Sequence, residues 1–321
     1  MNKFKKIGLT ALAGSLVATS AFAGAVTATG GASFEVQHVN GGAANAGKAF
    51  SMGNSITLTG AGELDNGLNV SISFELDAGV DTGTGSGPFD SHSVKVGNDQ
   101  FGTVTFSGHG GSSAQSAVDD TATGDIWDNG FSATAAPASS ASDNMIGYAL
   151  PELMEGLALN VSYTPHTATQ YESTMDWAVA YTGFENLTLG YASGESKGTK
   201  GSEADVSTYY AHYSYGPVTV KFTETEFDSE NTGTTADRDY TAYSVSYLLP
   251  GDEISISYNV ADLSTPNGTS DADQETSGIK ASYTAGGMTI SGKMINHDNN
   301  GFSTASSADL KMWELAASFA F

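Results

Sequence analysis

The feature that most constrains this chain is an alternation of apolar and polar residues that recurs along almost its whole length. In Leu68–Leu76 every second residue is apolar and those between are polar, and Ile254–Val260 repeats the pattern. Successive side chains of a β-strand point to opposite faces, so these segments predict strands with one apolar and one polar face. No segment shows a convincing period of 3.6, and we expect little helix.

Hairpin residues and longer polar stretches separate these segments in a regular order. Tight turns such as Asp65-Asn66-Gly67 and Gly286-Gly287 alternate with longer loops, of which 109–143 is the longest. Asn-Gly and Gly-Gly supply positive φ at low steric cost. Short turns at one end and long loops at the other are typical of outer-membrane barrels. We count about 16 antiparallel strands, at 32–40, 55–64, 68–78, 91–98, 102–108, 144–150, 157–165, 174–183, 186–195, 204–215, 218–227, 239–249, 253–263, 275–285, 287–296 and 309–321.

Residues 1–23 have the pattern of a secretory signal peptide. A lysine-rich head precedes an apolar stretch from Ile7, and the small residues Ala21 and Ala23 fit the cleavage pattern. We therefore expect export, cleavage, and a mature chain of residues 24–321. An N-terminal membrane anchor is the alternative, but the apolar stretch is well short of the roughly 20 residues that a spanning helix needs.

The mature chain is strongly acidic. The full sequence has 12 basic and 36 acidic residues, and removing Lys3, Lys5 and Lys6 leaves 9 basic against 36 acidic residues, a net charge of −27. Such a surface repels nucleic acid, whose phosphates need Lys and Arg, and it attracts cations. Cysteine is absent, which excludes a disulfide framework and a thiolate metal site. The regularly placed Tyr, Phe, Val and Ile argue against a disordered acidic chain.

The face that contacts lipid follows from energetics. A charge facing lipid costs a few kcal/mol at the membrane midplane, so the apolar set must face out and the polar set must line the lumen. A barrel of this size encloses water. We predict an all-β fold, a transmembrane antiparallel up-and-down β-barrel formed by residues 24–321. A soluble β-sandwich or β-solenoid is the alternative, and it would bury the face of Leu68, Val70 and Ile72 in a core.

The last predicted strand carries the most specific signal. Its residues Trp313, Leu315, Ala317, Phe319 and Phe321 share one face. A last strand that alternates in this way and ends in Phe resembles the C-terminal signature of Gram-negative outer-membrane proteins, which the barrel-assembly machinery reads. The resemblance makes Trp313, Phe319 and Phe321 the expected assembly signal. An ordinary edge strand is the alternative, but an aromatic edge is a liability unless it closes a barrel.

Two further segments resemble strands of the general bacterial porins. Gly102–Gly108 follows a tight turn and runs into the longest loop, like the porin strand before the constriction loop, and Asn144–Pro151 is similar to the strand after it. The resemblance implies a 16-stranded barrel in the outer membrane, usually a homotrimer, with the long third loop, here 109–143, folded into the lumen. Four carboxylates of that loop would then rim the pore constriction: Asp119, Asp120, Asp125 and Asp128. The alternative is a solvated acidic loop that lies outside.

The basic residues depart from the porin pattern. General porins usually place several arginines on the wall opposite the acidic loop, whereas this chain has one, Arg238, in a predicted outer loop. Gly147 stands where related porins often carry a basic residue before Tyr. Alternation points four lysines into the lumen: Lys95, Lys221, Lys280 and Lys293. Lys95, on the fourth predicted strand, is the best-matched wall cation at the constriction.

The sequence shows few residues in patterns typical of metal binding or catalysis. The six histidines show no metal-ligand spacing, and no nucleophile motif occurs, so we expect no enzyme activity and no resident cofactor. Divalent cations could still bind acidic loops, since hard cations prefer oxygen ligands. The expected function is passive, cation-selective diffusion of small hydrophilic solutes and ions through an outer-membrane porin, in contact with lipid. A substrate-selective channel and a structural or adhesive surface barrel are the alternatives.

Overall fold

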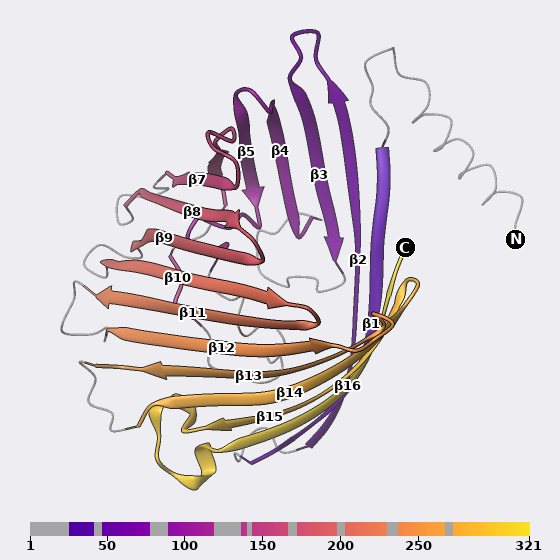
Figure 1. The fold of residues 1–321 in the computed structure, drawn as a ribbon, viewed down its shortest axis with the longest axis vertical. Coiled ribbons are helices and arrows are strands. Elements are labelled where there is room, and N and C mark those ends of the chain that lie inside the picture. The colour runs from indigo at the N-terminus through magenta and orange to yellow at the C-terminus, as the bar shows by residue number, and fades with distance from the viewer. Residues whose placement is uncertain are drawn as a thin grey trace, which may run out of the picture.

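The chain forms one closed antiparallel β-barrel in which every strand pairs with its neighbours in sequence (Figure 1). The first strand, β1 (Val26–Asn40), also pairs with the last, β16 (Leu310–Ala320), which closes the barrel. This computed structural model describes residues 26–41, 47–77, 89–118, 136–139, 143–165, 172–197, 203–229, 237–266 and 272–321. The predicted signal peptide, 1–23, lies outside them. The predicted count of 16 strands and the up-and-down topology are confirmed.

The strands between β1 and β16 follow in chain order around the barrel. They are β2 (Gly47–Glu63), β3 (Asn69–Asp77), β4 (Ser91–Asn98), β5 (Gly102–His109), β6 (Met145–Ala149), β7 (Leu157–Thr164), β8 (Thr174–Phe184), β9 (Leu187–Lys197), β10 (Glu203–Tyr215), β11 (Val218–Ser229), β12 (Arg238–Leu248), β13 (Ile254–Ser264), β14 (Gln274–Ala285) and β15 (Met288–Asp298). Helix in the described residues is limited to two short 3-10 turns, Asn300–Phe302 and Ser306–Ala308. None of the helices described is long and apolar enough to span a membrane.

The tight turns that were predicted from sequence reverse the chain where expected. Gly216, between β10 and β11, has φ of 56°, and Gly286, between β14 and β15, has φ of 60°. Asn186, between β8 and β9, also adopts φ of 60°. These values lie in the left-handed region, which glycine and asparagine enter at the lowest steric cost, so the turn residues fix the reversals locally.

The two faces of the sheet differ as the alternation predicts. Thr208, Thr223 and Thr225, on neighbouring strands, are fully buried. The residues next to this set point the other way, and Tyr243 and Val245 of β12 are about half exposed, at 48% and 45%. In a closed barrel the buried polar set faces the interior, so the apolar set faces outward, as lipid requires. A soluble fold with the apolar face in a core is therefore excluded.

Two strands begin well before the start that the alternation indicated. β1 begins at Val26 rather than 32, and β2 begins at Gly47 rather than 55. The added parts are rich in small residues and alternate weakly, but each pairs with the predicted part of the other strand: Val26 lies opposite Gly60, and Gly47 lies opposite Val39. Their backbone ladder therefore holds these extensions without a strong side-chain pattern.

The prediction that Arg238 lies in an outer loop was wrong. Arg238 is the first residue of β12 and pairs with Phe227 of β11. Its guanidinium carbon lies 4.3 Å from the centre of the Phe227 ring. A cation over an aromatic face is attracted by the ring quadrupole, and this contact extends the strand by one residue beyond the apolar alternation.

Candidate functional site

One described stretch of the longest loop, 111–118, lies against the inner wall. The Ala114 N–H donates to Ser162 Oγ of β7 at 2.8 Å. The Gln115 side chain, which has no exposed surface, donates through Nε2 to Thr208 Oγ1 of β10 at 2.9 Å. Both wall residues belong to the inward, polar set, so the start of the loop is bound to the interior of the barrel.

A second described stretch, 136–139, is bound to the first and to the wall. The Ser139 N–H donates to Gln115 Oε1 at 2.7 Å, and the hydroxyls of Ser139 and Ser113 lie 2.6 Å apart. The Ser139 hydroxyl donates to Asp176 Oδ2 of β8 at 2.7 Å. Asp176 is 1% exposed and also accepts the Glu195 N–H at 3.1 Å, so this carboxylate is a fixed part of the wall.

Apolar contacts support the same two stretches. Ala114, at the start of the loop, packs with Ala178 and Ala192 of β8 and β9. Ala136, near its end, packs against a buried cluster on β12 and β13 that includes Tyr240. Sequence reasoning missed all of these anchors. Asp176 alone carried a signal, as a carboxylate at an inward position of a predicted strand.

The four predicted constriction carboxylates, Asp119, Asp120, Asp125 and Asp128, lie outside the described residues. The two described stretches that flank them, 111–118 and 136–139, are bound to the wall.

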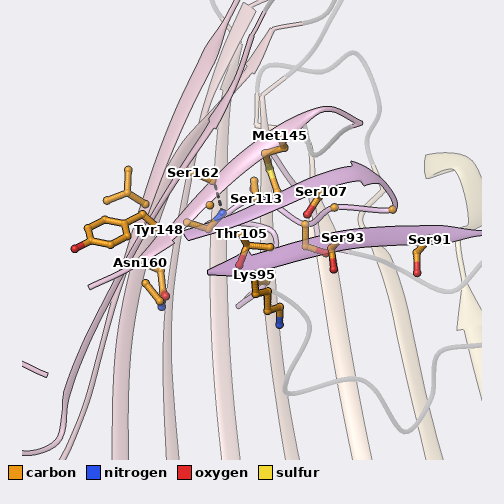
Figure 2. A pocket seen from close by; sticks show the side chains of 18 of the residues that line it. Ser91, Ser93, Lys95, Thr105, Ser107, Ser113, Met145, Tyr148, Asn160 and Ser162 are labelled. Atoms are coloured by element: carbon orange, nitrogen blue, oxygen red, sulfur yellow. Dashed lines mark hydrogen bonds between the residues drawn. The ribbon is translucent and has the colours of Figure 1, made fainter. Parts of the chain in front are cut away.

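Lys95, the predicted wall cation, is an inward residue of β4. It lines a cavity of about 340 Å³ between the inner wall of β4–β7 and the loop segment 110–117. Figure 2 shows Ser93 and Lys95 projecting from the same side of β4, with Ser107 of β5 beside them. Among the residues that the structure describes, Lys95 forms no ion pair.

The other three predicted lumenal lysines lie at inward positions of later strands. Lys221 of β11 is opposite Ser244 of β12. Lys280 of β14 and Lys293 of β15 are directly opposite each other. Lys293 Nζ lies 3.1 Å from Glu314 Oε1 of β16, and both side chains are nearly buried, so this ion pair joins the last two strands on the lumenal side.

Charge is sorted between the two faces of β9 to β15. Within the described parts of these strands, the inward charged residues are all basic: Lys221, Arg238, Lys280 and Lys293. The outward positions near the loop ends are acidic instead. These outward carboxylates are Glu195, Glu203, Asp205, Glu224, Glu226, Asp228, Asp239, Asp262, Glu275 and Asp298. Much of the net negative charge therefore lies outside the lumen.

The predicted assembly residues lie on the outward face of the closing strand. Trp313 and Phe319 of β16 are 40% and 50% exposed. Phe321 follows β16, and its N–H donates to Gly30 O at 2.9 Å while its carbonyl accepts the Gly30 N–H at 3.0 Å. A Cβ on Gly30 would lie 3.0 Å from the Phe321 ring and 2.6 Å from Ser55 O, so only glycine fits beside this residue.

Metal chemistry has no support among the described side chains. No three His, Asp or Glu residues in the described ranges are grouped so that they could hold a metal ion.

The closed barrel, its apolar exterior and its hydroxyl-lined interior define a transmembrane β-barrel of the channel-forming class. The sequence profile of the Gram-negative porins matches residues 8–321. The chain belongs to the Gram-negative porin family, which places it in the outer membrane and points to a channel rather than an enzyme.

Solved porin structures have the same fold at low sequence identity. The anion-selective porin from Comamonas acidovorans is 16% identical, with a TM-score of 0.72 over 92% of this chain and 99% of that chain. A porin refined at 1.8 Å resolution is 18% identical, with a TM-score of 0.70 over 92% and 100%. A mutant of the Rh. blastica porin is 18% identical, with a TM-score of 0.69 over the same shares. No curated protein matches the chain.

Proposed function

We propose that this porin is a passive diffusion channel for small hydrophilic solutes and ions. The observation that carries the proposal is a closed barrel of 16 strands whose inner face is rich in hydroxyl groups. A wall of this kind solvates polar solutes of many kinds. Purified protein in a planar bilayer should give discrete conductance steps in KCl, and the absence of steps from folded protein would contradict the proposal.

We also propose that the loop 109–143 narrows the lumen. Its two described stretches are bound to inward side chains of β7, β8 and β10, which supports an inward course for the segment between them. Long structureless loops in compact folds are usually functional. The four aspartates Asp119, Asp120, Asp125 and Asp128 would then lie at the narrowest part of the pore.

Cation selectivity belongs to the same proposal, and the loop carries it. Because the inward charges of β9 to β15 are basic, the net charge of −27 does not by itself make the lumen negative. The four loop aspartates and inward Glu35, Glu75 and Asp77 of β1 and β3 supply negative potential. The Comamonas porin is described as anion-selective, so the sign must be measured in this chain.

The test of cation selectivity is the reversal potential in a KCl gradient. Replacing the four loop aspartates by Asn should lower the cation-to-anion permeability ratio, most strongly in dilute salt, because the screening length falls to roughly 3 Å at 1 M. A matched control replaces four outward carboxylates, Asp205, Asp228, Glu275 and Asp298, by their amides. An anion-selective wild-type channel, or equal shifts in both quadruple variants, would refute this part of the proposal.

Two further properties complete the proposal. The chain is exported with cleavage after Ala23, so N-terminal sequencing of the outer-membrane form should begin at Gly24. The mature barrel forms a homotrimer. The apolar outer surface of β1 and β2 is available for contact between subunits, since Phe34 and Phe50 pack at 6.1 Å between ring centres and are 49% and 72% exposed.

A further inference from the structure

A recess on the inner wall has no carboxylate among its described lining residues, although the chain as a whole is strongly acidic. It is the cavity of about 340 Å³ between β4–β7 and the loop segment 110–117 (Figure 2). No Asp or Glu is among its described lining residues, and Lys95 is the lysine that reaches it. His109 also lines it, but its Nδ1 lies 2.7 Å from Asp143 Oδ1, so this imidazole is already engaged.

The floor of the recess is a row of hydroxyl groups around an open position. In the strand register Lys95 lies opposite Thr105, Thr105 opposite Gly147, and Gly147 opposite Ser162. One pair further along, Ser93 lies opposite Ser107. Among the described residues, a Cβ on Gly147 would meet Thr105 Cβ alone, at 3.9 Å, so the position without a side chain leaves space in the wall.

These groups match one kind of ligand. A lysine ammonium offers three donors and a hydroxyl offers one, and a carboxylate accepts from both in short charge-assisted bonds. The remaining serine hydroxyls both donate and accept, so they fit the hydroxyl groups of a solute. A neutral sugar would leave Lys95 without a counter-charge, and a divalent cation would be repelled by it.

We propose that the recess is a binding site for small hydroxylated carboxylates, of which sugar acids are examples. The carboxylate binds Lys95 and Thr105, and the hydroxyl groups bind Ser93 and Ser107. The site rests on the proposed channel function, since the ligand reaches it through the lumen. A solute that pauses there makes the flux of such acids saturable, whereas the flux of small inorganic ions is not.

The experiment uses the full-length purified porin in a planar bilayer with dilute KCl, and sodium gluconate is the probe. Gluconate should reduce the ion current in a saturable way, and glucose at the same concentration should do so far less. Lys95→Gln should raise the half-blocking gluconate concentration about 10- to 150-fold, as expected for losing one hydrogen bond to a charged group. Gly147→Leu fills the recess without changing charge and should remove the block.

A matched control separates the recess from general electrostatics. Lys311→Gln removes the same charge from an exposed residue of β16 and should leave the gluconate block unchanged. The proposal is overturned if Lys95→Gln leaves the block unchanged, if Lys311→Gln weakens it equally, or if glucose blocks as well as gluconate. A folded protein that conducts KCl but shows no gluconate block refutes this site alone, whereas one that does not conduct refutes the channel function as well.

Discussion

One buried carboxylate, Asp176, is among the wall groups that bind the loop 109–143. Asp176 accepts the Ser139 hydroxyl at 2.7 Å and the Glu195 N–H at 3.1 Å. The bond to Glu195 joins β8 to β9, so of the two bonds of Asp176 only the one to Ser139 reaches the loop. We therefore expect Asp176→Ala to weaken the loop attachment while the strands around it stay paired.

The size of the effect follows from the kind of bond. A hydrogen bond to a charged group contributes about 1.5–3 kcal/mol, which changes the ratio of attached to released loop roughly 10- to 150-fold. Asp176→Asn keeps an acceptor for the Ser139 hydroxyl but loses the charge. A neutral bond contributes about 1 kcal/mol, so this variant should lie between the wild type and Asp176→Ala.

Single-channel recording measures this ratio. In Asp176→Ala the time spent at secondary conductance levels should rise 10-fold or more, and in Asp176→Asn it should rise less. The proportion of protein that migrates as folded barrel before boiling should be equal in all three proteins, which controls for misfolding. If Asp176→Ala has the same conductance levels and dwell times as the wild type, the Asp176–Ser139 bond does not hold the loop.

Three further predictions concern assembly and stability. Deleting Phe321 should lower the amount of folded barrel in the outer membrane but not the conductance of the barrels that form, because the two hydrogen bonds with Gly30 close the seam; a normal amount of folded barrel would contradict this. Glu314→Gln should lower the free energy of unfolding, measured by urea denaturation, by about 3 kcal/mol, because it removes the carboxylate that pairs with the nearly buried Lys293. The double variant Glu314→Leu, Lys293→Met should lose less, and equal losses would show that the ion pair is not the cause. Unboiled protein should migrate as a trimer and boiled protein as a monomer, and a single folded band at monomer size would disprove the homotrimer.

The barrel could be predicted from sequence because its determinants are local. A period of two marks each strand, and residues such as Gly216 and Asn186 mark the reversals. The weakly alternating start of β1 was missed for the converse reason, since its strand conformation depends on pairing with β2. Arg238 was misplaced because its contact with Phe227 lies across a hairpin.

The loop anchors could not be predicted, because they join residues that are far apart in the chain. Gln115 and Thr208 are separated by 93 positions, and nothing in the residue types of either marks the other as a partner. The alternation does not show which residues of neighbouring strands are partners, whereas the strand register does. Once β15 and β16 are paired, Lys293 lies opposite Glu314. The inward positions of Lys221 and Lys280 needed only the alternation.

The sorting of charge on β11 has a consequence for how such chains diverge. Lys221, Thr223 and Thr225 face the barrel interior, while Glu224 and Glu226, interleaved with them, face away. The even and odd positions of one strand therefore contact different surroundings. Substitutions at the outward positions can accumulate in evolution without changing the inward positions, and the reverse also holds. The isoelectric point of such a chain can drift with conditions at the cell surface while its permeability stays constant. Two relatives with the same overall charge can equally well pass opposite ions.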